Sequence, residues 1–168
     1  MQVDSFRFLP RSFRPMYENP SLPMGEPEGP VWAPFGKRLA QSRVALLSSA
    51  GIHLRSQPAF DLERERAEPE WGDPSWRAIP AGTPPDQLAV AHHHISDTDI
   101  LLDPEIALPM RGLAALVEAG IVGSATPTHI SVMGFQAAGL DGWRDETAPE
   151  ITALLRSEGA DGVILAPA

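Results

Sequence analysis

The sequence contains no cysteine among its 168 residues. This absence excludes disulfide bonds, thiolate metal ligands and a cysteine nucleophile within these residues. Lysine is almost as scarce, because Lys37 is the only one, and its surroundings suit neither a Schiff base nor a phosphate-binding loop. No apolar run approaches the ~20 residues that a membrane span needs, and the first residues lack the charged-then-apolar order of a signal peptide. We therefore expect a cytoplasmic protein.

Positive charge is also in short supply. Lys and Arg number 13 against 22 Asp and Glu, which gives a net charge of −9. Nucleic acids and anionic membranes are bound through basic surfaces, so we expect neither as a partner. The content of 43% hydrophobic and 21% charged residues is that of a globular protein, and the length suits one domain with a real core.

Proline, in contrast, is abundant and unevenly distributed. Seven of the 18 prolines fall between Pro10 and Pro34, which forbids long helices there. The same stretch carries many large apolar side chains that would be costly to leave in water. We therefore expect residues 1–36 to form an irregular arm that wraps over the core or over a partner subunit, and residues 37–168 to form the folded domain.

The domain alternates strand-like and helix-like segments. An unbroken apolar run at 44–49 is typical of a strand buried on both faces of a parallel sheet. Helices are expected over 109–120, with a glycine at its end, and over 147–159, with Thr147 as N-cap. The other expected segments are a strand at 88–95, extended pieces at 121–123 and 128–133, a buried strand at 162–166, and a connection with little periodicity at 52–85.

This order predicts an α/β fold, with a mostly parallel sheet flanked by helices in a Rossmann-like or flavodoxin-like three-layer arrangement. Ligands of such sheets bind beyond the carboxyl ends of the strands. The rule places residues 48–53, 92–99 and 129–133, and whatever follows residue 168, at one edge of the sheet. We expect these segments to converge there.

Histidines are the first candidates for chemistry at that edge. Three are consecutive, and strand alternation would put His92 and His94 on one face. Two histidines with nearby carboxylates suit a divalent metal such as zinc, iron or manganese. The alternative is that they hydrogen-bond the loop backbone and line a pocket without metal.

Two further segments have the composition of binding loops. The small residues of 48–51 can present backbone N–H groups to an anion, or can simply form a tight turn. The turn-rich segment 72–80 offers Trp76 as an aromatic surface and Arg77 as a bidentate cation. Either Arg77 clamps a substrate carboxylate, or it pairs with one of the many acids while Trp76 is buried.

Three segments taken together resemble the selenoprotein B family of the glycine, sarcosine, betaine and D-proline reductases. They are the strand and turn 44–53 with 57–60, the segment 72–80, and the stretch from 92 to 134. The closing strand 159–165 is similar to the last strand that precedes the family's redox motif. The resemblance covers the chain from about Lys37 onward, and it depends on the order and spacing of the segments rather than on any one of them.

The resemblance implies a subunit that cleaves a carbon–nitrogen bond of an amino acid reductively, with electrons delivered by thiols. Its attacking group would be a selenocysteine, or a cysteine in variants, and in the known cases the substrate is held on a pyruvoyl group of a partner subunit. The positions implied to line the substrate pocket are Ser49, Gly51, His53, Asp73, Arg77, His92, His94 and His129.

The sequence departs from the family where the redox motif would begin, because it holds no cysteine or selenocysteine. We therefore expect the selenocysteine in a continuation of the chain beyond Ala168, and no activity from this chain alone. Its partners would be other reductase subunits or further copies of itself, with a small amino-acid-like substrate. Two alternatives remain: a non-catalytic binding or assembly module on the same scaffold, and a histidine-based metalloenzyme.

Overall fold

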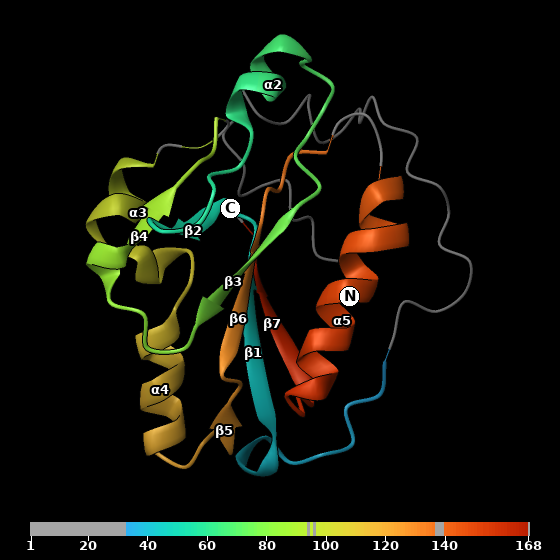
Figure 1. Ribbon diagram of the computed structural model, residues 1–168. Helices are drawn as coiled ribbons and strands as arrows, with labels where there is room; N and C mark the ends of the chain where they lie inside the picture. The colour runs from blue at the N-terminus through green and yellow to red at the C-terminus, as the bar shows by residue number, and fades with distance from the viewer. Residues whose placement is uncertain (1–32, 94, 96, 137–139, 168) are drawn as a thin grey trace, which may run out of the picture. The chain divides into compact units, whose positions relative to one another are not determined.

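The centre of the fold is a sheet built around strand β1 (Arg43–Ser48). The computed structural model describes residues 33–93, 95, 97–136 and 140–167, so the expected arm, up to residue 32, lies outside the described residues. Strand β7 (Gly162–Ala166) pairs in parallel along one side of β1. Strands β5 (Ser124–Ala125) and β6 (Thr128–Val132) pair in parallel along its other side (Figure 1).

The sheet is completed by β3 (Trp76–Pro80), which runs antiparallel to β6 at the opposite edge from β7. Because β3 is reversed, its first residues lie at the carboxyl end of β6: Trp76 pairs with Val132. The sheet is therefore mostly parallel, as expected, with one antiparallel edge strand.

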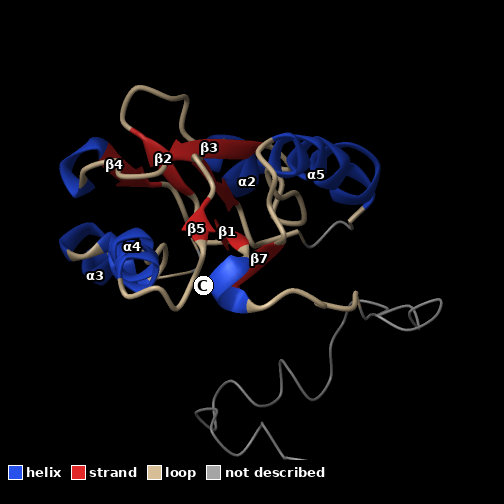
Figure 2. Ribbon diagram, turned by 90° about the horizontal axis from the view of Figure 1, so that it is seen from below, coloured by secondary structure: helices blue, strands red, loops and turns tan. Residues whose placement is uncertain are grey.

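Helices cover both faces, which confirms the expected class of fold. Along β1, Val44 and Leu46 belong to the core beneath α4 (Met110–Glu118), whereas Ala45 belongs to the core beneath α5 (Ala148–Ser157). This alternation is the pattern of a strand buried on both faces. Figure 2 shows α3 (Thr98–Leu102) and α4 on one side of the strands and α5 on the other.

The two long helices lie close to where the apolar spacing puts them. Gly120 and Gly159 follow them with φ of 69° and 73°, the left-handed conformation that ends a helix. The expected cap of the second helix is wrong, because a π-helical turn, η5 (Trp143–Thr147), runs directly into α5. The Thr147 hydroxyl instead donates to the carbonyl oxygen of Pro74, which fastens the helix to the segment before β3.

The connection 52–85 is more ordered than its sequence indicates. It contains β2 (Ile52–Leu54), α2 (Leu62–Ala67) and β3. The expected strand over 88–95 is only β4 (Leu88–Val90), and it pairs antiparallel with β2 outside the main sheet, so that expectation is wrong. Short 3-10 turns complete the described elements: η2 (Leu39–Gln41), η3 (Pro85–Gln87) and η4 (Pro104–Ile106).

Strand β7 lies at an edge of the sheet rather than in its interior. Within the described residues it pairs with β1 alone. Its apolar side chains are exposed, Val163 by 40% and Leu165 by 68%, so the expectation of a buried strand is wrong for this part of the chain. An apolar run indicates a strand but does not say which neighbours it has. None of the helices in the described part of the chain is both long and apolar enough to cross a membrane.

Candidate functional site at the carboxyl edge of the sheet

The carboxyl ends of β1, β6 and β7 lie close together at one edge of the sheet. The N–H of Ser49 donates to the carbonyl oxygen of Ala166 (3.3 Å), so the end of β7 lies beside the end of β1. On the other side, the N–H of Gly134 donates to the carbonyl oxygen of Ser49 (3.1 Å). Ser49 therefore lies between the end of β7 and the segment that follows β6, as the rule for parallel sheets predicts.

Gly51 gives this edge its shape. Its φ is +64°, and a Cβ at this position would overlap the carbonyl oxygen of Ala91. The N–H of Ala91 donates to the carbonyl oxygen of Gly51 (3.0 Å), which brings the residue after β4 against the turn after β1. His92 follows Ala91 directly in the chain and is half-buried.

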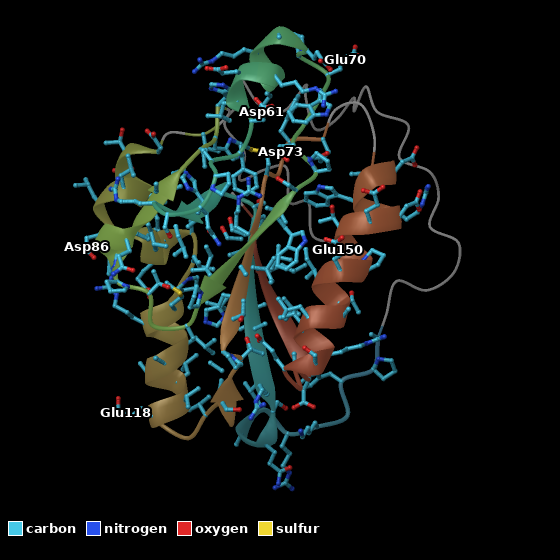
Figure 3. The ribbon with its side chains drawn as sticks, viewed as in Figure 1. Asp61, Glu70, Asp73, Asp86, Glu118 and Glu150 are labelled. Atoms are coloured by element: carbon cyan, nitrogen blue, oxygen red, sulfur yellow. The ribbon has the colours of Figure 1, made fainter. Side chains whose placement is uncertain are left out.

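Asp73 organises the loop that covers the edge. Its carboxylate is 7% exposed and accepts hydrogen bonds from the N–H of Asp61 (2.9 Å) and from the N–H and hydroxyl of Ser75. Asp61 and Asp73 lie near each other above the strands in Figure 3. The preceding Gly72 packs so tightly that a Cβ there would overlap the carbonyl oxygen of Phe135. The loop is thus held against the segment that follows β6.

Arg77, at the start of β3, fastens a second loop. Its guanidinium donates to the carbonyl oxygens of Pro58 (2.9 Å) and Ala59 (3.1 Å) and to the Ser75 hydroxyl (2.9 Å). The same group lies 4.3 Å from the centre of the Phe60 ring. Burial lowers the pKa of Arg77 and Asp73 opposes that effect, but an arginine stays charged in either case. These donors are mostly engaged with main chain, so the role of a substrate clamp stays a prediction.

Trp76 connects the same strand to the opposite layer. Its indole N–H donates to the carboxylate of Glu150 in α5 (2.9 Å), and Glu150 is labelled beside that helix in Figure 3. Trp76 is half-buried, between the two outcomes expected for it.

The remaining histidines have separate surroundings. His53 is buried, and its Nδ1 donates to the carbonyl oxygen of Leu54 (2.9 Å). The Nε2 of His93 donates to the carbonyl oxygen of Leu62 (3.1 Å). His94 lies outside the described residues. No group of three or more histidines and carboxylates able to hold a metal occurs where the structure describes the chain, so the pair expected to bind metal stays a prediction.

His129 does not join the edge, and its expected convergence with the other segments is wrong. It is the second residue of β6, near the amino end of that strand, and pairs with Ile79. Its Nδ1 accepts a hydrogen bond from the N–H of Leu46 (3.2 Å), and the ring is 1% exposed. The carboxyl-end rule holds only for the last residues of the segment 129–133, because only these reach the edge.

Sequence reasoning missed two glutamines that hold the edge together. Gln57 accepts from the N–H of Leu54 (2.9 Å) and donates to the carbonyl oxygen of Ala78 (2.9 Å). Gln136 donates to the carbonyl oxygen of Asp73 (2.9 Å). Gln57 lies in the segment 57–60, which contributes to the family resemblance, and this is the only sequence feature that points to it. The resulting edge is a closely packed backbone surface around Ser49 and Gly51.

Comparison with known proteins gives this geometry a context. Over 138 residues, 81% of its length, the chain is 32% identical to the gamma subunit of D-proline reductase from Acetoanaerobium sticklandii. The matched region is 52% of that subunit, so the chain spans about half the length of the curated relative it matches. No family model matches the chain, and no solved structure matches it.

The identity supports the resemblance at the level of the amino-acid reductases, while the narrower assignment to selenoprotein B stays a prediction. The strands and loops of the carboxyl edge lie in the 37–168 region on which the resemblance was based. The chain is thus related, over most of its length, to about half of a D-proline reductase subunit.

Proposed function

We propose that this chain is part of an amino-acid reductase, of the D-proline reductase type, that cleaves a carbon–nitrogen bond with electrons from thiols. The observation that carries the proposal is the 32% identity with the gamma subunit over 81% of the chain. The other subunits of such a reductase are the proposed partners, and a small amino acid is the proposed substrate.

The geometry of the edge supports this proposal. The carboxyl end of β7 lies beside Ser49, because the N–H of Ser49 donates to Ala166. Residues that follow β7 therefore enter at the same edge as the turn at Gly51. The resemblance implies a redox motif after the last strand, and such a motif would be delivered to the side of Ser49 that faces β7.

The chemistry needs a soft nucleophile that these 168 residues do not contain, since they include no cysteine. In the proposal, a selenol or thiol outside these residues supplies it. For D-proline, two electrons and two protons break the bond between Cα and the ring nitrogen and give 5-aminopentanoate. A dithiol supplies both electrons and both protons and becomes a disulfide, so the reaction balances.

The test uses the native protein, purified from its source with its co-purifying subunits. D-proline, glycine, sarcosine and betaine are each supplied with dithiothreitol, and the cleaved products are measured by mass spectrometry. We expect one of the four to yield product with one dithiothreitol oxidised per bond cleaved. Thiol oxidation that no substrate stimulates, in a complex with intact subunits, would overturn the proposal and favour the assembly module.

Neighbouring histidines offer a matched pair of variants. His92→Asn alters the residue after Ala91, whose backbone contacts Gly51, whereas His93→Asn alters a ring that binds the carbonyl oxygen of Leu62. We expect His92→Asn to lower turnover in the reconstituted complex by at least about tenfold and His93→Asn to lower it far less. Equal turnover in both variants would remove His92 from the proposed site.

A further inference from the structure

A pocket lies on the α4 face of the sheet and is distinct from the carboxyl edge. Its volume is about 260 Å³. Its walls are mainly apolar and include Leu88, Met110, Ala114, Ala125 and His129. An apolar cavity of ~150 Å³ can hold benzene, so this pocket has room for a small ring with substituents.

His129 is a polar residue in this mainly apolar wall. Because Nδ1 of His129 accepts the hydrogen bond from the N–H of Leu46, the ring proton is on Nε2. Burial lowers the pKa of His129, and Glu158 opposes that effect, so the ring is neutral at pH 7. Among the described residues, no group accepts a hydrogen bond from Nε2. Because His129 lines the pocket, a ligand bound there can supply the acceptor.

The charged side chains at the pocket form ion pairs with one another. Arg111 is 2.6 Å from the carboxylate of Asp103 and 3.6 Å from that of Glu105. Glu105 also accepts the N–H groups of Arg111 (2.9 Å) and Gly112 (3.0 Å) at the start of α4. One arginine against two carboxylates leaves a negative balance at this end of the pocket, which disfavours an anionic ligand.

We propose that this pocket binds a small neutral molecule with an apolar ring or branched body and one carbonyl oxygen, which accepts a hydrogen bond from Nε2 of His129. The apolar walls contribute most of the affinity, and the histidine selects for the acceptor. The proposal is independent of the reductase chemistry, because the pocket shares no residue with the edge around Ser49.

The test compares two probes of nearly equal shape by NMR titration of the full chain. Cyclohexanone has the carbonyl oxygen, and methylenecyclohexane replaces it with a carbon that accepts no hydrogen bond. We expect both to shift the amide signals of Leu88, Ala114 and Ala125 saturably, with Kd near 1 mM for cyclohexanone and roughly fivefold weaker binding for methylenecyclohexane. Absence of saturable shifts at these residues, or equal Kd values for the two probes, would overturn the proposal.

Variants of the protein test the hydrogen bond from His129 and the volume of the pocket separately. His129→Asn keeps an acceptor for the N–H of Leu46 and replaces the Nε2 donor by a shorter amide N–H group that reaches less far into the pocket, so the preference for cyclohexanone over methylenecyclohexane should be reduced. Ala114→Trp should close the pocket to both probes, whereas Ala115→Trp, on the next residue of α4 and outside the pocket, should leave both Kd values unchanged. Should His129→Asn not fold, the probe pair on the wild type and the two tryptophan variants still decide the proposal. Unchanged binding in Ala114→Trp would place the probes elsewhere.

Discussion

At position 51 the backbone and its surroundings both demand glycine. The φ of +64° is unfavourable for other residues, and a Cβ would meet the carbonyl oxygen of Ala91. Gly82 has a similar φ of +81°, but nothing lies within 4 Å of the position of its absent Cβ. Comparing the two glycines therefore distinguishes the cost of the positive φ from the cost of a clash between the added Cβ and its neighbours.

We expect Gly51→Ala to lower the free energy of unfolding by about 3 kcal/mol or more, and Gly82→Ala by about 1 kcal/mol. The measurement is urea denaturation of both variants and the wild type. If the two variants were equally destabilised, the close contact between Gly51 and Ala91 would contribute nothing.

The buried ring of His129 gives the protein a pH dependence of stability. Its folded-state pKa is lowered by burial, against an opposing contribution from Glu158, while the unfolded ring titrates near ~6.5. The unfolded state therefore binds more protons between these two values. The stabilisation is complete above about pH 6.5 and is lost as the pH falls below it, until the folded ring protonates in turn.

The pH dependence is measured by denaturation at pH 7.5 and pH 5.5 in the wild type and in His129→Asn. The groups around the ring that also carry charge are Glu158, Arg111 and Glu105, and both proteins retain them. We expect the wild type to lose more stability between the two pH values than the variant does. Equal losses in the two proteins would assign the pH dependence to other groups.

Sequence reasoning reached some residues of the site and not others. Gly51 was found because small residues after an apolar strand mark a turn at the carboxyl edge. His129 was misplaced because a five-residue strand spans the sheet, and the sequence does not say which of its ends a side chain is near. Its partner, the N–H of Leu46, is distant in sequence and leaves no local pattern.

Among the elements, β3 and the loop before α2 depend on Arg77. This side chain joins the start of the strand to the carbonyl oxygens of Pro58 and Ala59 by planar, forked hydrogen bonds. Lysine keeps the charge but cannot reproduce the fork. Arg64, in α2, is a matched control, because it is half-exposed, binds Glu68 four residues on and lies over the ring of Trp71.

We expect Arg77→Lys to lower the free energy of unfolding by about 2 kcal/mol and Arg64→Lys to change it by less than about 0.5 kcal/mol. Thermal denaturation gives both values, and limited proteolysis should show faster cleavage near Pro58 in Arg77→Lys alone. A wild-type stability for Arg77→Lys would mean that the loop is held by other contacts.

The elements that sequence predicted best are those whose own residues decide them. Both long helices have an apolar stripe and a terminal glycine, and β1 has a continuous apolar run. The region 52–85 gave no such pattern, because its order comes from side chains that bind main chain far along the sequence. Gln57, Asp73 and Arg77 are examples, and a local period cannot reveal their partners.

For the molecule as a whole, the most conspicuous feature is the exposed apolar edge of the sheet at β7. Val163, Ile164 and Leu165 are 40%, 45% and 68% exposed on a strand that is paired on one side among the described residues. Edges of this kind associate with other strands unless charge or cover prevents it. We expect the purified 168-residue chain to self-associate as its concentration rises.

We expect Leu165→Lys to reduce that association, seen as a lower average mass in light scattering, with little change in unfolding free energy. Leu102→Lys is the control, because Leu102 is 80% exposed but lies at the end of α3 rather than on the sheet. Equal effects of the two variants would indicate general hydrophobicity rather than strand pairing.

The pairing of β1 has a consequence for how the chain is made. This strand is synthesised before all of its neighbours in the sheet, because β5, β6 and β7 come from the last third of these residues. Because the ribosome synthesises the chain in order, β1 emerges before its partner strands. Its apolar side chains remain exposed to water until these strands have left the exit tunnel. Such non-local pairing slows folding and extends the time in which a chain can aggregate. Chaperone binding to the nascent segment 43–48 is therefore expected, and slowing translation would lengthen the interval during which β1 needs that protection.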